Sequence, residues 1–424
     1  MSVDTQEHVP TGQLPVVVEH SRSGPAHSAG PERLVTPTFV VAWVVNFLQY
    51  LTFYMLVTTM ALYAVKSFAA SDAVGGFASS AFVVGATLAR LVSGYLVDAL
   101  GRRRMLLIAL VVVAVACALY IPAGSLPVLI AVRMVHGFGY AFASTAVMTI
   151  AQSVIPDSRR GEGTGYFALG TTLATAIGPA LGLFLVGNLD YTWLFWTTLA
   201  TAVLGLVLGI FLREPLAHQE AKAERSKFSP SDIAHPSVLP IGSFMLVVGV
   251  CYAGVITYLN AYAEERGVTT GAALFFVAYA VAMLIMRLVL GKVQDQRGDN
   301  VVVYLGLICF AVALGILAVA TQDWQVVVAG AMTGLGYGTL MPAAQAIAVS
   351  AVPAHKLGTG ISTLLLLMDV GVGIGPVVLG LLLSATGFGT MYTVLAVLVV
   401  VAALLYHAVH GRHPHAKRGR LAVD

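Results

Sequence analysis

The sequence predicts an all-α integral membrane protein whose twelve transmembrane helices form two six-helix halves. Three observations predict this class. Among the 424 residues, 58% are hydrophobic and only 10% are charged, and the mean hydropathy is +0.87. Apolar runs long enough to cross the roughly 30 Å hydrocarbon core of a bilayer recur along the chain. The two halves of the sequence also match each other at one constant spacing.

The composition excludes several classes of protein. Soluble globular domains carry about 25% charged residues, so we do not expect a water-soluble enzyme or a nucleic-acid-binding protein. A net charge of +3 is too small to indicate a polyanionic partner. Cys117, Cys251 and Cys309 fall inside apolar runs, which predicts packing residues and not disulfides or metal ligands. No cofactor and no metal site are expected.

Each element is assigned from the apolar runs and the polar residues that bound them. Residues 1–36 are rich in Pro, Gly, Ser and His and lack the features of a signal peptide, which predicts a disordered tail. Twelve apolar runs then follow, each predicted to be a membrane-spanning helix. They cover residues 38–64, 73–97, 104–123, 127–155, 163–188, 191–212, 239–262, 270–291, 301–320, 325–352, 358–385 and 389–408.

The long polar stretch after the sixth run divides the spans six and six. The predicted organisation is therefore a tail at 1–36, a six-helix bundle at 37–212, a linker at 213–238, a second bundle at 239–408 and a basic tail at 409–424. Cytoplasmic loops of membrane proteins carry an excess of Lys and Arg. Eighteen of the 23 Lys and Arg residues fall in the tails and the even-numbered loops. Both termini are therefore expected to face the cytoplasm, in a multi-pass protein of the cell membrane.

An internal repeat relates the two halves at an offset of 197 residues. The segment RLVSGYLVDALGRR from Arg90 falls on RLVLGKVQDQRGDN from Arg287 without a gap. The same offset pairs Tyr140 with Tyr337, and it pairs glycines and prolines further along. Those pairs are Gly137 with Gly334, Gly139 with Gly336, Gly161 with Gly358, Gly163 with Gly360, and Gly178-Pro179 with Gly375-Pro376. Two bundles repeated in the same orientation predict a transporter whose site lies at the midplane between them.

Three motifs carry a resemblance to a known family. The loop after the second span, Gly94-x-Leu96-x-Asp98-x-x-Gly101 followed by three arginines, resembles the loop signature of the major facilitator superfamily. Arg133-x-x-His136-Gly137 resembles the fourth-span motif of that family. Gly178-Pro179, repeated as Gly375-Pro376, is similar to the fifth-span motif of its drug antiporters. The resemblance covers about residues 38–408.

Within the superfamily, the chain looks like a twelve-span exporter of drugs or metabolites. The run RRGEGTGYFALGTTLATAIGPALG is similar to a group that includes drug:proton antiporters and staphylopine-type metallophore exporters. The resemblance implies a secondary exporter driven by proton antiport, with a small-molecule substrate, protons and the bilayer as partners. It also implies a monomer without enzymatic activity. A proton-coupled importer of sugars or organic acids is the alternative, and an integral-membrane enzyme is disfavoured because no nucleophile, metal cluster or carboxylate pair is evident.

Asp98 is predicted to form a conformational latch. Anions are stabilised at helix N-termini, so Asp98 is expected to meet the start of the eleventh span, near Gly358. The other residues assigned to this latch are Gly94, Gly101 and Arg102, and the repeat adds Gly291, Asp295 and Gly298. The alternative is that the arginines only orient the chain.

Relatives in the resembled family often have an acid at the end of the fourth span. This chain has Ala151-Gln152-Ser153 at that place, so the charge relay is either incomplete or completed by Asp157.

Charged residues inside spans are costly and are candidates for function. Arg90 and Asp369 are expected to meet, because the resembled fold packs their spans together, and to act as a gate between the halves or in proton coupling. The alternative is a static buried ion pair. Arg287 is the counterpart of Arg90, and a side chain that extends toward the membrane surface is its alternative role. Thr172 occupies the position equivalent to Asp369.

Arg133 is expected to bind substrate or to couple protons, and its charge suits a carboxylate-bearing or zwitterionic substrate. Polar residues at helical spacing on the first, fourth and tenth spans are expected to line the cavity, where the alternative is contact between helices. These residues are Asn46, Gln49, Tyr50, His136, Tyr140 and Tyr337.

Overall fold

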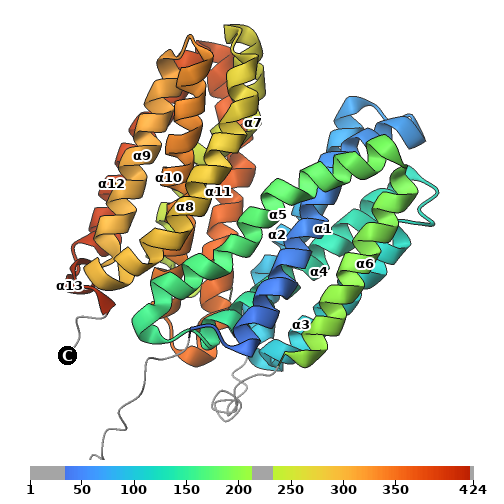
Figure 1. Cartoon of the computed structure of the whole chain (residues 1–424), viewed down its shortest axis with the longest axis horizontal. Coiled ribbons are helices and arrows are strands. Elements are labelled where there is room, and N and C mark those ends of the chain that lie inside the picture. The colour runs from blue at the N-terminus through green and yellow to red at the C-terminus, as the bar shows by residue number, and fades with distance from the viewer. Residues whose placement is uncertain (1–33, 213–232, 421–424) are drawn as a thin grey trace, which may run out of the picture. The chain divides into compact units, whose positions relative to one another are not determined.

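The computed structural model describes residues 34–212 and 233–420 of the chain (Figure 1). Most of the predicted N-terminal tail and linker lies outside the described residues. The helices of the first half are α1 Pro37–Phe68, α2 Asp72–Leu100, α3 Arg102–Leu119, α4 Leu126–Ser153, α5 Arg160–Asn188 and α6 Tyr191–Phe211. Those of the second half are α7 Leu239–Arg266, α8 Thr269–Arg297, α9 Asp299–Val319, α10 Asp323–Ser350, α11 Leu357–Thr386 and α12 Phe388–Tyr406.

The helices agree with the twelve predicted spans, and the largest shift of an end is at α8, which runs to Arg297 and not to residue 291. Eleven of the described helices have the length and hydropathy of a membrane span. The twelfth, α3, has 18 residues and begins with three arginines. The fold class predicted from the sequence is therefore confirmed.

Local sequence determines where these helices begin and end. Thr36 caps α1, because its side chain accepts a hydrogen bond from the backbone N–H of Phe39 at 3.1 Å, and Pro37 follows at the first helical position. Gly101 separates α2 from α3 with a φ of 94°, and Gly298 separates α8 from α9 with a φ of 92°. Only glycine adopts such backbone angles without strain. The two repeat-related turns are therefore made by the same residue type for the same reason.

The two halves use the same pattern of helix packing. In the first half, α2 packs on α4, α1 on α5 and α6, and α3 on α4 and α6. In the second half, α8 packs on α10, α7 on α11 and α12, and α9 on α10 and α12. Each pair corresponds to its partner under the sequence repeat, so the repeat is a repeat of packing as well as of sequence.

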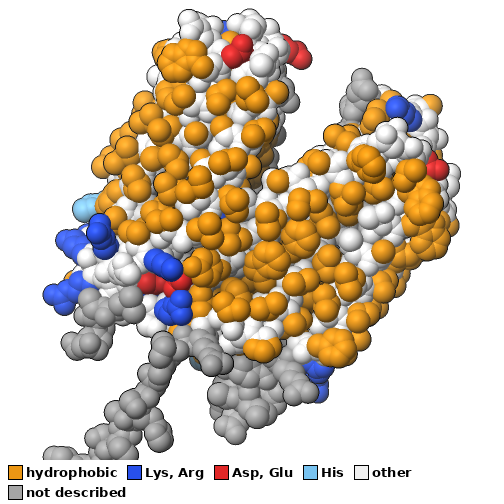
Figure 2. Space-filling view, in the orientation of Figure 1, with side chains coloured by type: hydrophobic (Ala, Val, Ile, Leu, Met, Phe, Trp, Pro, Cys, Tyr) orange, Lys and Arg blue, Asp and Glu red, His pale blue; other side chains and the backbone are white. Residues whose placement is uncertain are grey.

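Large hydrophobic side chains are exposed on the helices of both bundles, as expected for helices that face lipid. Figure 2 shows hydrophobic side chains covering the helices, with Lys and Arg gathered near one end. We call this end, which carries the turns at Gly101 and Gly298 and the starts of α5 and α11, the basic end. The other end is the opposite end.

Glycines allow α4 and α10 to lie against their neighbours within each half. A Cβ atom at Gly137 would collide with the backbone carbonyl of Phe82, and one at Gly334 would collide with that of Tyr279. Gly315, in α9, has open space where a Cβ would be.

We therefore predict opposite effects of alanine at two helical glycines. Gly137→Ala should lower the free energy of unfolding by about 1–3 kcal/mol, because the methyl group overpacks the α2–α4 contact. Gly315→Ala should cause no loss, because alanine is the better helix former. Thermal unfolding of the purified variants in detergent measures both effects, and equal stability of the two variants would contradict this account of the packing.

Candidate functional site

The side chain of Asp98 joins the two halves at the basic end. Its carboxylate accepts hydrogen bonds from the backbone N–H groups of Gly358 at 2.9 Å and Thr359 at 2.8 Å, and from the Thr359 hydroxyl at 2.8 Å. These N–H groups belong to the first turn of α11, where a helix has no internal acceptors for them. The neighbour expected for Asp98, the start of the eleventh span, is thus the one found.

Asp295 makes the equivalent contact in the opposite direction. Its two carboxylate oxygens accept hydrogen bonds from the backbone N–H groups of Gly161 and Glu162, each at 2.8 Å, in the first turn of α5. Gly161 is the repeat counterpart of Gly358. Each half therefore provides an aspartate that caps a helix of the other half. We call these contacts the Asp98 latch and the Asp295 latch.

Glycines bring the helices of each latch together. A Cβ at Gly94 would lie 2.7 Å from the Cα of Thr359, and a Cβ at Gly291 would lie 2.7 Å from the Cα of Glu162. Any side chain at either position would push the capping aspartate away from its helix. The glycines and aspartates of the repeat are therefore parts of the same two contacts.

Other charges surround the latches. Arg102 donates a hydrogen bond to the carbonyl of Ala354, in the turn before α11, and it is buried. Glu162 pairs with Arg159 at 2.7 Å and lies 3.5 Å from Lys292 of the other half. Asp157, considered above as a substitute acid, pairs with Arg160.

Arg90 and Asp369 form an ion pair deeper in the interface between α2 and α11. The Arg90 Nε donates to Asp369 Oδ2 at 2.5 Å, and the side chains are 5% and 22% exposed. Ser362 donates to the Arg90 carbonyl at 2.8 Å and lies 3.0 Å from the Ser93 hydroxyl. Arg90 and Asp369, which are 279 positions apart in sequence, are thus brought together. We call this contact, together with the repeat-related contact of Arg287 and Thr172, the polar seam.

The repeat-related interface between α5 and α8 has no equivalent acid. Arg287, the counterpart of Arg90, donates to the hydroxyl of Thr172 and to the carbonyl of Ala168. It is 9% exposed, so it does not extend to the membrane surface. The Nε of Arg287 has no hydrogen-bond partner among the described residues. Among the described residues, these two repeat-related contacts therefore contain two guanidinium groups, of Arg90 and Arg287, and one carboxylate, of Asp369.

Tyrosines from both halves surround these charges. Tyr50 and Tyr140 meet edge to face, with ring centroids 5.6 Å apart, and Tyr252 and Tyr337 stack at 3.6 Å. Arg90 interacts electrostatically with Tyr140 and Tyr50. Arg287 interacts in the same way with Tyr279, Tyr54 and Tyr337. The predicted cavity residues Tyr50, Tyr140 and Tyr337 thus lie beside the charged seam.

Arg133 and His136 are buried inside the first half. Arg133 is 0% exposed; it donates to the carbonyl of Ser79 at 2.8 Å and lies over the ring of Phe82 at 5.0 Å. The Nδ1 of His136 lies 3.0 Å from the hydroxyl of Tyr120. Neither side chain has a surface through which it could touch a substrate in this structure.

Asn46 and Gln49 are also buried, on α1. The Asn46 amide donates to Thr171 of α5 at 3.4 Å, whereas neither amide atom of Gln49 has a partner among the described residues.

Gly178 and Gly375 of the glycine-proline motifs fit closely against the neighbouring helices α1 and α7. A Cβ at Gly178 would lie 2.5 Å from the Cβ of Tyr54. A Cβ at Gly375 would lie 2.7 Å from the Cβ of Ala253. The prolines that follow them lie inside α5 and α11.

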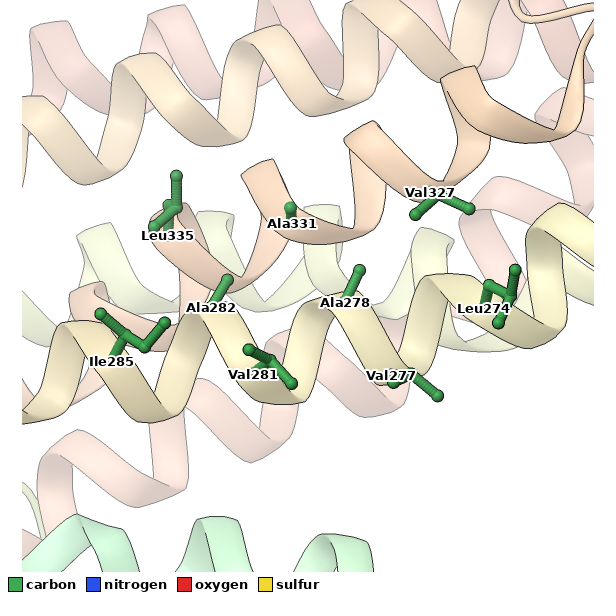
Figure 3. Close-up of a pocket in the computed structure, with 9 residues that line it drawn as sticks. All are labelled: Leu274, Val277, Ala278, Val281, Ala282, Ile285, Val327, Ala331 and Leu335. Carbon is green, nitrogen blue, oxygen red and sulfur yellow. The ribbon is translucent and has the colours of Figure 1, made fainter.

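A groove of about 450 Å³ lies between α8 and α10, away from the seam (Figure 3). Its lining is apolar throughout, namely Leu274, Val277, Ala278, Val281, Ala282, Ile285, Val327, Ala331 and Leu335. The groove offers no polar group that could select a substrate, so the polar seam and its tyrosines are the candidate site.

The chain matches the Major Facilitator Superfamily over residues 42–301 and again over residues 269–422. It belongs to this superfamily. An uncharacterized MFS-type transporter of Escherichia coli K12, YhhS, is 26% identical over 381 residues, which is 87% of this chain and 91% of YhhS. The YhhS of Salmonella typhimurium is 28% identical over 57% of this chain and 58% of its own length.

Solved structures share the fold. The human organic anion transporter MFSD10 (TETRAN) has a TM-score of 0.75 and 18% identity, over 89% of this chain and 100% of MFSD10. FucP in its outward conformation has a TM-score of 0.75 and 16% identity, over 89% of this chain and 99% of FucP. The proton:xylose symporter XylE has a TM-score of 0.71 and 16% identity, over 90% of this chain and 97% of XylE. As a member of the superfamily, the chain is a multi-pass membrane transporter.

Several residues of this site are not predicted from the sequence. Tyr252 and Tyr279 are two of them, although tyrosines inside apolar spans are a usable signal. The contact between Arg287 and Thr172 was also not anticipated, although the repeat had already matched both residues to the Arg90–Asp369 pair. Side-chain contacts across an interface require the helix orientations, which a single sequence does not contain.

We predict that Asp98→Asn abolishes transport and leaves membrane insertion intact. The amide removes the negative charge and turns one acceptor into a donor that faces the N–H groups of α11. Gly101→Val should have the same effect, because valine does not tolerate a φ of 94°. Asp190→Asn is the matched control, since Asp190 caps Trp193 within the first half at 3.1 Å. Transport at the normal rate by Asp98→Asn would contradict the latch, and insertion is checked by the amount of protein in purified membranes.

Proposed function

We propose that this transporter exports a small organic molecule by proton antiport, through alternating access between its two halves. The Arg90–Asp369 pair carries the proposal, because it places a titratable carboxylate in the interface that must open. A charge within a membrane span is costly unless it is paired. Protonation of Asp369 would therefore change the attraction between the halves directly.

The cycle follows from the contacts at the basic end. With Asp369 charged, its ion pair and the two latches hold α2 to α11 and α5 to α8. When Asp369 takes up a proton, the ion pair is lost and the basic end opens more easily. Release of the proton at that side then lets the substrate bind, and the pair re-forms as the basic end closes. One proton enters for each substrate that leaves.

The direction follows from the charge bias of the loops. The arginines and lysines near the latches favour a basic end that faces the cytoplasm, with both termini on that side. We propose that the structure is the outward-facing state, because the latches and the ion pair that join the halves are all formed. Export is favoured over import by the Gly178-Pro179 motif of α5 and its resemblance to drug antiporters.

The charges of the seam favour a substrate with a carboxylate, either an acid or a zwitterion. Arg90 is paired with Asp369 there, whereas Arg287 has Thr172 as its partner, so one positive charge is not paired with an acid among the described residues of the seam. Arg287 is the better candidate for binding this carboxylate. Arg133, which the sequence favoured, is fully buried inside the first half.

A proton-coupled importer of sugars or organic acids is the second candidate. XylE, which shares the fold, is a proton:xylose symporter. An importer would use the same carboxylate with the opposite direction of substrate movement. The two functions differ in the direction of the proton gradient that drives accumulation of the substrate.

Proteoliposomes test the direction of coupling. Vesicles containing the purified protein would be given a panel of radiolabelled organic acids, amino acids and sugars. An acidic lumen should drive accumulation, because each proton that leaves brings a substrate in. Accumulation driven only by an acidic exterior would identify the symporter instead. Empty vesicles with the same gradient are the control.

The Arg90–Asp369 ion pair leads to a separate prediction. Asp369→Asn or Arg90→Ala alone should reduce proton-coupled transport by at least about tenfold, because each leaves a buried charge without its partner. The double variant should lose much less than the product of the two single losses. Transport rates of the wild type, the two single variants and the double variant complete this double-mutant cycle. Losses that simply multiply would show that the two residues act independently.

A further inference from the structure

The two latches differ in the source of their positive charge. At the Asp98 latch, Arg102 lies at the start of α3 within electrostatic range of Asp98. The repeat places Asp299 at the position of Arg102, so the second half has an extra acid where the first half has a base. Asp295 and Asp299 would therefore repel each other beside the start of α5 unless a cation came from elsewhere.

Arg420 provides that cation from the C-terminal segment. Its Nη1 lies 3.1 Å from Asp295 Oδ1 and its Nη2 lies 3.2 Å from Asp299 Oδ1. The arginine side chain is 18% exposed, while the two carboxylates are 2% and 9% exposed. One guanidinium thus bridges both acids. Arg160 also lies within electrostatic range of Asp295, but its hydrogen bonds go to the Gln152 carbonyl and to Asp157.

The segment that carries Arg420 is held against the α8–α9 turn by specific contacts. His410 lies 2.9 Å from Asp299 Oδ2, and the Gly411 carbonyl accepts a hydrogen bond from Asn300 at 2.8 Å. A Cβ at Gly298 would lie 2.8 Å from the Ala416 carbonyl, and one at Gly419 would collide with the Gln296 carbonyl. The backbones touch so closely at Gly298 and Gly419 that Arg420 has a defined position.

We propose that residues 407–420 form a strap that keeps the Asp295 latch closed, and that Arg420 is its positioning residue. Arg420 places a positive charge beside Asp295, as Arg102 does beside Asp98, but it belongs to a segment outside the repeat. Removing the strap would weaken one latch and leave the other intact. The balance between the two access states would then shift toward opening at the basic end.

The proposal rests on the alternating access proposed above, but not on the substrate, the ion or the direction. The test is therefore a distance measurement on the full-length protein without substrate. Spin labels at Arg104→Cys in α3 and Val301→Cys in α9, with Cys117, Cys251 and Cys309 replaced by alanine, would report the separation of the halves at the basic end. Two separations that exchange in population correspond to the closed and open states.

Arg420→Ala should raise the ratio of open to closed protein by about fivefold, which is the upper end of the effect of a partly exposed charge pair. Gly419→Leu, which keeps Arg420 but displaces the segment, should produce a similar shift, and Arg420→Lys a smaller one. Asp299→Asn in the Arg420→Ala background should reverse most of the shift, because the uncompensated acid is gone. Arg418→Ala is the matched control, since Arg418 is exposed and has no hydrogen bond or ion pair among the described residues.

Unchanged distances in both Arg420→Ala and Gly419→Leu would overturn the proposal. A shift of equal size in Arg418→Ala would also overturn it, because it would show an effect of overall tail charge. Failure of Asp299→Asn to reverse the shift would exclude charge compensation as the role of Arg420. Thermal unfolding of each variant identifies a loss of folding, in which case Arg420→Lys and the control provide the comparison. Transport in the wrong direction would contradict the proposed function but would leave these distances unchanged.

Discussion

Capping of a helix in one half by an aspartate from the other half is the interaction on which the arrangement of the halves depends. Asp98 satisfies the free N–H groups at the start of α11, and Asp295 does so at the start of α5. A carboxylate is favoured there by the positive end of the helix dipole as well as by the hydrogen bonds. Glycines at positions 94 and 291 are needed because only a bare backbone lets the helices approach so closely. Both latches are formed by short-range contacts, so a small separation of the halves would break both of them.

A departure from the repeat places a carboxylate at only one of two equivalent positions in the interface. The two halves contribute Arg90 and Arg287 at equivalent positions, but one meets Asp369 and the other meets Thr172. If both partners were hydroxyls, this part of the interface would contain no carboxylate. If both were acids, two ion pairs would have to break for each opening. In the proposed mechanism, the single carboxylate Asp369 makes the closed state sensitive to one protonation, and Arg287 remains available for an anionic group.

The asymmetry extends to the latches. Arg102 and Asp299 occupy equivalent positions with opposite charges, and a segment outside the repeat provides Arg420 where the second half lacks a cation. Duplicated halves can share one backbone contact and still differ in what stabilises it. A charge supplied by a terminal segment can be withdrawn without changing any membrane-spanning helix, whereas Arg102 is part of α3 itself.

The sequence by itself determined the fold class, the twelve helices and the pairs of equivalent residues. Long apolar runs can only be spans in a bilayer, and a constant offset can only arise from two similarly folded halves. The resemblance to the superfamily, together with the preference of anions for helix N-termini, indicated that Asp98 would meet the start of α11. Only the tertiary structure decided which polar residues lie in the seam. Arg133 and Arg287 are both arginines within apolar runs, but the rotation of α4 buries the first inside its bundle and that of α8 turns the second toward the other half. Arg420 could not be assigned for the same reason, since its partners lie more than 120 residues away and are defined by the packing of the segment on the α8–α9 turn.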